Sequence, residues 1–304
     1  MAPKEALLHG GLTPLPILDH VPKPIEVHRR RTFVTCGLLL LAWIANDVAL
    51  AWIHERVPRG VPPLPDLWFN FFPELTGAIY ITEYLMIAVM ANAIIVIICH
   101  QHRWVVARRV LFITALCYGY RALCITLIQV PVPSVHTYCA PKSESADFGV
   151  VAKRVFGMFS SAGIESLRQR VLCGDLIVSG HTLSLFIGEM TFKQYAPKKL
   201  NWLSYVLTGC SIAGIICILL ARKHYTIDVV LGYYLATRTF WSYHSLVQVL
   251  NFGTAEFDKS LLARTFWAPI VKYLEADAPP PSMFVNRLQW PSACPQLLRR
   301  KCAY

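Results

Sequence analysis

Six apolar segments, each about 20 residues long, constrain the fold of this chain more than any other feature of its sequence. Backbone polar groups in hydrocarbon must be hydrogen-bonded within the structure, and a helix of this length crosses a hydrocarbon core about 30 Å thick. We therefore predict an all-α polytopic membrane protein that folds as a six-transmembrane-helix bundle. The expected spans are residues 33–53, 79–99, 110–130, 176–192, 203–221 and 225–241.

The composition agrees with this prediction. Hydrophobic residues make up 55% of the chain and charged residues only 15%. The net charge is +11, but lysine and arginine stand in short clusters between the apolar segments and do not line one face of a polar domain. This distribution is typical of membrane topology and argues against nucleic acid as a partner.

The basic clusters also predict the orientation of the bundle, because short cytosolic loops retain Lys and Arg. The clusters precede the first segment, separate the second from the third and the fourth from the fifth, and end the chain. Their members are Arg29, Arg30, Arg31, Arg103, Arg108, Arg109, Lys193, Lys198, Lys199, Arg299, Arg300 and Lys301. We expect both termini to be cytosolic and the loops 54–78, 131–175 and 222–224 to be lumenal or extracellular.

The chain divides accordingly into three expected parts. Residues 1–32 form a cytosolic N-terminal segment, residues 33–245 the six-helix transmembrane domain, and residues 246–304 a cytosolic tail with no domain of its own.

The ten cysteines do not form a disulfide scaffold, because most of them lie in apolar segments as small hydrophobic residues. Cys139 and Cys173 share the long lumenal loop, and the sequence leaves open whether they are bridged. It also leaves open whether Cys294 and Cys302 in the tail are palmitoylated or free.

A first chemical motif stands at the start of the fourth segment. It runs from Asp175 to the sequence Ser179-Gly180-His181-Thr182. The glycine permits close approach of a ligand to the backbone, the hydroxyl groups flank the histidine, and the imidazole is able to protonate a leaving oxygen. We take His181 as a candidate general acid and base.

A second motif opens the sixth segment on the same expected side of the membrane. His224 and Asp228 are four residues apart, so on a helix they share a face, and the carboxylate fixes the imidazole tautomer. An imidazole oriented in this way is a good nucleophile. Alone, the spacing fits a structural hydrogen-bonded pair equally well; the presence of both motifs on one side favours a joint site.

Other polar residues in the apolar segments are candidates for function, because ionisable groups are costly in hydrocarbon. Arg121 and Asp47 lie deep, where either fits one half of an interhelical ion pair, and Glu83 lies near the lumenal end. Clustered Cys and His spacing and the HExxH pattern are absent, so we predict neither a metal nor a cofactor.

The two motifs resemble the signatures of the sphingomyelin synthases, within the wider lipid phosphate phosphatase superfamily. The likeness covers residues 30–275 and includes the stretches Cys173-Gly174-Asp175, Ser179-Gly180-His181-Thr182, His224-Tyr225-Thr226-Ile227-Asp228, Pro62-Pro63-Leu64-Pro65-Asp66 and Arg108-Arg109 with Tyr118 and Arg121. It implies transfer of phosphocholine from phosphatidylcholine to ceramide, which yields sphingomyelin and diacylglycerol. The implied catalytic residues are His181, His224 and Asp228. We assign substrate binding to Asp175, Ser179, Gly180, Thr182, Tyr225 and Arg121.

Departures from the family pattern leave the head group open. Arg222 and Lys223 precede the second histidine, where family members often carry an acidic residue. The alternative is a ceramide phosphoethanolamine synthase that uses the same triad, followed by a lipid phosphatase or a non-catalytic transporter or scaffold. The resemblance implies a Golgi or plasma membrane protein whose site faces the lumen or exterior. The oligomeric state, a homo-oligomer included, stays open.

Overall fold

The computed structural model describes residues 28–143, 148–161, 164 and 172–290. Throughout these residues the chain is helical, and no strand forms beyond an isolated bridge between His100 and Leu288. The prediction of an all-α protein is therefore confirmed. Cys294 and Cys302 lie outside the described residues.

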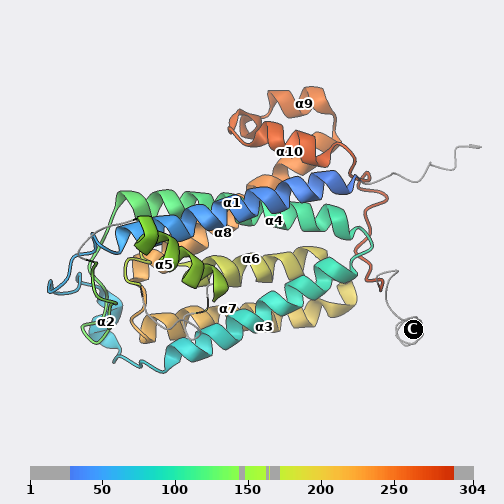
Figure 1. Cartoon of the computed structure of the whole chain (residues 1–304). Helices are drawn as coiled ribbons and strands as arrows, with labels where there is room; N and C mark the ends of the chain where they lie inside the picture. Colours follow the sequence, from blue (N-terminus) through green and yellow to red (C-terminus); the bar gives the residue numbers. More distant parts are fainter. Residues whose placement is uncertain (1–27, 144–147, 162–163, 165–171, 291–304) are drawn as a thin grey trace, which may run out of the picture.

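All six apolar segments form helices, which run side by side in Figure 1. They are α1 (Arg29–Ile53), α3 (Ala78–Cys99), α4 (Arg103–Leu127), α6 (Gly180–Tyr195), α7 (Asn201–Leu220) and α8 (Thr226–Asn251). Among the described residues, four helices are long and apolar enough to cross a membrane: α1, α3, α4 and residues 198–220, which contain α7. The short helix α6 has 16 residues.

Shorter helices connect or follow these six. They are α2 (Leu67–Phe71), α5 (Phe148–Ser160), α9 (Thr254–Lys259) and α10 (Ala268–Glu275), with single 3₁₀ turns at Lys198–Leu200 and Leu261–Arg264. We call the end of the bundle where α6 and α8 begin the histidine end. The opposite end, where α4 begins with Arg108 and Arg109 in its first turns, is the arginine end (Figure 1).

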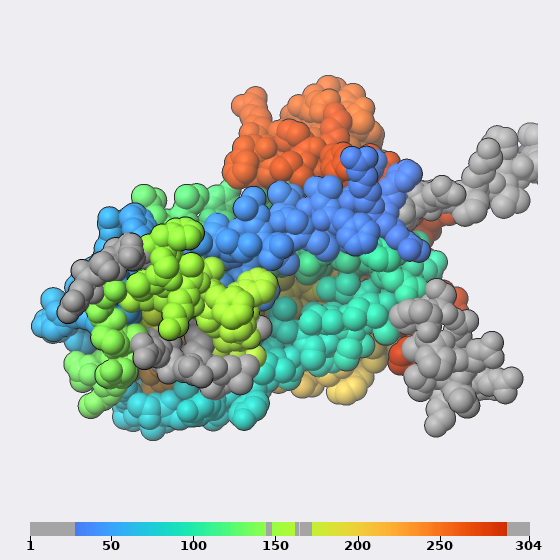
Figure 2. Space-filling view, viewed as in Figure 1, coloured from blue at the N-terminus to red at the C-terminus, as the bar shows by residue number. Residues whose placement is uncertain are grey.

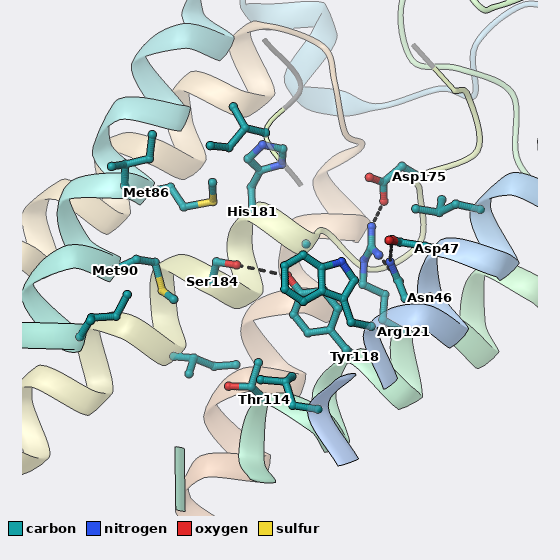
Figure 3. Close-up of a pocket in the computed structure, with 18 of the residues that line it drawn as sticks. Asn46, Asp47, Met86, Met90, Thr114, Tyr118, Arg121, Asp175, His181 and Ser184 are labelled. Carbon is teal, nitrogen blue, oxygen red and sulfur yellow. Dashed lines mark hydrogen bonds and ion pairs between the residues drawn. The ribbon is translucent and has the colours of Figure 1, made fainter. Parts of the chain in front are cut away.

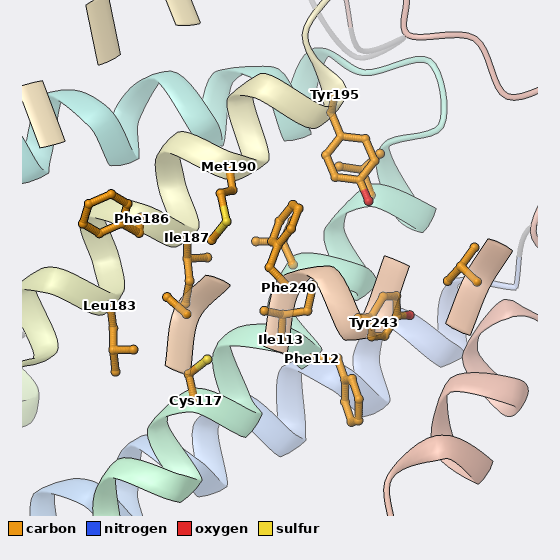
Figure 4. Close-up of a cluster of buried hydrophobic side chains, with 14 of the residues drawn as sticks. Phe112, Ile113, Cys117, Leu183, Phe186, Ile187, Met190, Tyr195, Phe240 and Tyr243 are labelled. Atoms are coloured by element: carbon orange, nitrogen blue, oxygen red, sulfur yellow. The ribbon is translucent and has the colours of Figure 1, made fainter. Parts of the chain in front are cut away.

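Helix α6 lies at the centre of the bundle and packs against α3, α4, α7 and α8. Its inward side chains interdigitate with those of α4 and α8 around Phe112, Met190 and Phe240 (Figure 4). Small residues let the neighbours approach closely, as is usual between membrane helices. A side chain at Gly188 would come within 3.0 Å of Val89 on α3.

The remaining helices enclose this centre unevenly. Helix α1 packs along α4, whereas α3 packs on α6 and α7. Few contacts therefore bridge the side of the bundle between α1 and α3, and a cavity of about 500 Å³ lies there.

The arginine end differs from the prediction of a basic loop. Helix α4 begins at Arg103, seven residues before the expected start of the span, and buries both Arg108 and Arg109. Arg109 donates from Nε (3.0 Å) and Nη2 (2.6 Å) to the Glu275 carboxylate, which also accepts from the Tyr243 hydroxyl at 2.8 Å. The pairing offsets the cost of burying these charges.

The chain beyond α8 folds back onto the bundle, which the sequence analysis did not predict. Helices α9 and α10 lie beside α1, α4 and α8 (Figure 1). Asp277 then binds Arg108 at 2.8 Å and Arg31 at 3.2 Å. Further along, Gln101 N and Gln289 N donate to backbone carbonyls across the two segments, Gln101 to Arg287 and Gln289 to Cys99. The C-terminal segment thus closes the arginine end.

The Glu275 pair generates a stability prediction. Burial raises the pKa of the Glu275 carboxyl, but the charges of Arg109 and Arg108 and the hydrogen bonds from Arg109 and Tyr243 together outweigh burial and hold the pKa below the ordinary 4.5. The ionised carboxylate therefore stabilises the fold at a pH above the ordinary pKa of a glutamate. This stabilisation is lost as the pH falls through the lowered pKa of the folded state. We expect Glu275→Gln to lower the free energy of unfolding by roughly 3–5 kcal/mol, because it leaves a buried guanidinium uncompensated.

Thermal unfolding in detergent measures this effect. The matched control is Glu256→Gln, which removes an exposed pair with Lys259 (3.1 Å) and should change stability by less than about 0.5 kcal/mol. Equal melting temperatures of the two variants would contradict the role of the Glu275 pair.

Candidate active site

The first histidine stands on the first turn of α6. Ser179 is the N-cap residue of this helix, and its Oγ accepts a hydrogen bond from Thr182 N at 3.3 Å. A glycine is favoured at position 180, because a Cβ atom there would lie only 3.3 Å from the Arg121 guanidinium. His181 then projects toward the start of α8 with its side chain only 12% exposed.

The second histidine precedes α8, which begins at Thr226. His224 is therefore in a turn and not on the helix where the sequence analysis placed it, yet the predicted contact forms. Its Nδ1 lies 3.3 Å from Asp228 Oδ2, and the same oxygen accepts from Tyr225 N at 3.0 Å. A carboxylate on the first turn that bonds the backbone N–H preceding its helix is half of a capping box.

Asp228 also joins the two motifs to each other. Its Oδ1 accepts from Ile177 N at 2.9 Å, and its backbone oxygen accepts from Ser179 N at 3.1 Å. Ile177 has φ of 76°, a left-handed conformation that is strained for a β-branched residue. The bond from Ile177 N to the carboxylate holds this strained turn beside the histidines.

The two imidazole rings lie edge to face at the histidine end. Their centroids are 6.2 Å apart and their planes make an angle of 66°. Both histidines line one cavity of about 60 Å³, so a single group bound there can contact both rings. Glu83 of α3 lies on the other side of His181, with Oε1 at 4.0 Å from Nε2.

Arg121 of α4 lies below the first motif and is almost fully buried. Its guanidinium donates from Nε to Val178 O at 2.9 Å, from Nη1 to Asn46 Oδ1 of α1, and pairs through Nη2 with Asp175 (Figure 3). The expected interhelical role of Arg121 thus takes the form of a three-way link between α1, α4 and the loop before α6.

A disulfide and a histidine fix the other end of that loop. Cys139 and Cys173 are bridged, which answers the question that the sequence left open. His54, just after α1, accepts at Nδ1 from Cys173 N (3.0 Å) in its neutral form, and its Nε2 lies 3.0 Å from both Ala140 O and Arg59 Nη2. Burial lowers the pKa of His54, which favours this neutral form. The start of the first motif is thereby anchored to α1.

Two cavities meet at His181. The larger one, about 500 Å³, lies among α1, α3, α4 and α6 and is mostly apolar, with Met86, Met90 and Trp43 in its wall. Figure 3 shows its polar end, where His181, Asp175 and Arg121 converge. The smaller one, about 60 Å³, is lined by His181, His224, Asp175, Arg222 and Lys223. An apolar chamber that opens onto a polar notch suits a substrate with a fatty tail and a charged head.

Only some of the other residues that were predicted to bind substrate line a cavity. Asp175 and Gly180 line the larger cavity, whereas Ser179, Thr182 and Tyr225 line neither. The Tyr225 hydroxyl donates to Pro131 O and accepts from Leu64 N, both at 3.0 Å. A substrate-binding role for these three side chains stays a prediction. The described residues hold no group of three His, Cys, Asp or Glu side chains arranged for a metal ion.

Sequence reasoning missed the role of Asp66. Its Oδ2 accepts from Thr226 N at 2.7 Å and its Oδ1 from Thr226 Oγ1 at 2.9 Å, so it caps α8 beside the second histidine. The preceding proline-rich stretch was a signal for this residue, but the partner lies 160 residues away in the sequence.

Comparison with known proteins adds independent evidence. Residues 172–245, which contain both histidine motifs, match the family described as PAP2 superfamily C-terminal. The chain is 50% identical over 257 residues to sphingomyelin synthase-related 2 of Caenorhabditis elegans, with 84% of this chain and 78% of the relative covered.

Vertebrate relatives extend the likeness over most of the chain. The human phosphatidylcholine:ceramide cholinephosphotransferase 1 is 31% identical, over 96% of this chain and 70% of the relative. The mouse phosphatidylcholine:ceramide cholinephosphotransferase 2 is 34% identical, over 87% and 73%. With the histidine pair, its carboxylate and these relatives together, the chain belongs to the sphingomyelin synthase family.

Proposed function

We propose that this protein transfers phosphocholine from phosphatidylcholine to the primary hydroxyl of ceramide, giving sphingomyelin and diacylglycerol. The observation that carries the proposal is the pair of imidazoles whose ring centroids are 6.2 Å apart, beside an apolar cavity and a polar notch. The names of the vertebrate relatives support the same donor and acceptor.

In the first half-reaction His224 is the nucleophile. Its Nδ1 faces Asp228, so the proton resides there and the Nε2 lone pair is free to attack phosphorus. The N–P bond forms as the bond from phosphorus to the glycerol oxygen breaks. His181 donates a proton to that oxygen, and diacylglycerol leaves. Asp228 stabilises the positive charge that develops on the His224 ring.

The second half-reaction reverses these roles on ceramide. His181, now neutral, removes the proton from the primary hydroxyl, and the resulting oxygen attacks phosphorus. The new O–P bond forms as the N–P bond breaks, which releases sphingomyelin and restores both histidines. No metal or cofactor takes part in the scheme.

Several features support choline as the head group. The carboxylates of Asp47 and Asp175 stand at the polar end of the larger cavity, with the aromatic rings of Trp43 and Tyr118 in the same wall. Carboxylates and aromatic faces together attract a quaternary ammonium group. Arg222 lines the notch beside the second histidine, but its Nη2 donates to Phe69 O at 3.0 Å, which holds the guanidinium toward α2. Ceramide phosphoethanolamine synthesis is the alternative outcome.

The proposed topology has six spans, both termini in the cytosol and the histidine end in the Golgi lumen or outside the plasma membrane. It is supported by the position of α6 and α8 among the four apolar helices and by the basic residues at the arginine end. A disulfide at the histidine end fits an oxidising compartment. A homo-oligomer stays a prediction.

A donor assay tests the function. Vesicles with the purified protein, ceramide and labelled phosphatidylcholine, phosphatidylethanolamine or phosphatidate should give labelled sphingomyelin from the first donor. Transfer only from phosphatidylethanolamine would establish the alternative. Release of inorganic phosphate from phosphatidate without an acceptor would instead identify a phosphatase.

Substitution of the histidines tests the assigned chemistry. We expect His181→Gln and His224→Gln each to reduce transfer by at least about 100-fold, the usual contribution of a positioned acid, base or nucleophile. The matched control is His136→Gln, because His136 is an exposed histidine in the loop at the same end. Full activity of His224→Gln would rule out the scheme.

Arg121 provides a test of positioning. We expect Arg121→Met to reduce kcat by at least about tenfold, because it leaves the Val178 carbonyl and Asp175 without their donor and loosens the loop that carries His181. Arg121→Lys should restore part of kcat, since it keeps the charge. Arg238→Met is the control, because Arg238 is an exposed helical arginine stacked on Tyr234. A change in KM alone would indicate substrate contact instead.

A further inference from the structure

Helix α5 descends along α1 from the histidine end, although the sequence analysis assigned it to a lumenal loop. Near its middle, Arg154 pairs with Glu55 at 2.6 Å and donates to Ala51 O at 3.4 Å. Near its end, the Phe159 ring lies 5.5 Å from that of Trp43. Trp43 is about 12 Å further along α1 than Ala51. The end of α5 therefore reaches well below the end of the bundle.

The two faces of α5 differ in their surroundings. One face packs on α1 and α4 through Met158, which is 3% exposed, with Val151 and Val155 beside it. The other face presents Phe156, 74% exposed, and part of Phe159, 44% exposed. The charged residues of the helix, Lys153 and Arg154, both precede Phe156. Phe148, the first residue of the helix, is also exposed (86%), so exposed aromatic rings stand on both sides of the two basic residues. Exposed apolar side chains together with basic ones are typical of a helix at a membrane interface.

Exposed apolar side chains also stand on the part of α1 along which α5 runs. Ile44 and Val48, between Trp43 and Ala51, are 40% and 43% exposed. Leaving a phenylalanine in water instead of burying it costs about 1.5–3 kcal/mol. Figure 2 shows α5, in lime, on the side of the molecule between α1, in blue, and α3, in teal. Trp43 also lines the larger cavity on this side.

We propose that α5 is a re-entrant helix whose Phe156 face contacts lipid acyl chains in the leaflet at the histidine end. Helix α5 lies against the bundle at its side between α1 and α3, where the larger cavity is. Lipid tails that enter that cavity from the bilayer pass the α5 face. The proposal rests on the bundle crossing a membrane and is independent of which head group is transferred.

Photo-crosslinking tests the contact directly. Phe156 is replaced by benzoylphenylalanine, and the protein is reconstituted in vesicles of deuterated phosphatidylcholine and irradiated. Mass spectrometry then identifies the adducts. We expect adducts to lipid acyl chains. Ile95, 56% exposed on α3 near the arginine end, is the positive control for lipid contact, and Tyr138, 78% exposed in the loop before α5, is the position expected to give none.

Each other outcome overturns the proposal. No acyl adduct at position 156, with adducts at position 95, means that the α5 face lies in water. Adducts to a second copy of the chain mean that the face is a protein interface. The variant's fold is checked by retention of the Cys139–Cys173 disulfide and by its melting temperature, neither of which depends on activity. Transferase activity is no part of this readout, so failure of the proposed function would leave the adduct pattern unchanged.

Discussion

The hydrogen bonds of the Asp228 carboxylate are the interaction on which the rest of the site depends. One oxygen bonds the backbone N–H of Tyr225 and faces His224, while the other holds the strained turn at Ile177. The start of α8 and the start of α6 are thereby joined by a single side chain that is fully buried. A charge-assisted bond in such surroundings is strong, and an unpaired carboxylate would be costly. The same contacts that stabilise the turn therefore also set the tautomer of His224, the nucleophile in the proposed scheme.

Other contacts fix the loop that carries His181 and the two ends of the bundle. Arg121 ties the loop before α6 to α1 and α4, and the disulfide with His54 ties the beginning of that loop to the end of α1. At the opposite end, the Arg109–Glu275 pair locks the C-terminal segment against α4. The side between α1 and α3 is the less tightly packed part of the bundle, and we propose that a lipid reaches the cavity from there. The histidine end of the bundle thus positions the candidate catalytic side chains, and the side between α1 and α3 holds the cavity.

The sequence was sufficient for the features that depend on neighbouring residues. Apolar length predicted the six helices, and the chemistry of His181, His224 and Asp228 predicted a shared site at one end. The features that it could not supply depend on distant partners. Asp66 caps α8 across 160 residues, and Arg109 meets Glu275 across 166. Helix α5 appeared as a loop because 13 residues are too few to read as a span, and its depth is set by packing on α1.

The central claim is that His224 carries the head group between donor and acceptor. The most direct measurement is to incubate the protein with labelled phosphatidylcholine in the absence of ceramide, quench it in alkali, where phosphohistidine is stable, and locate the adduct by peptide mass spectrometry. The account predicts phosphocholine on His224, lost on addition of ceramide as sphingomyelin forms. Label on His181, or full transfer activity with no adduct on either histidine, would contradict it.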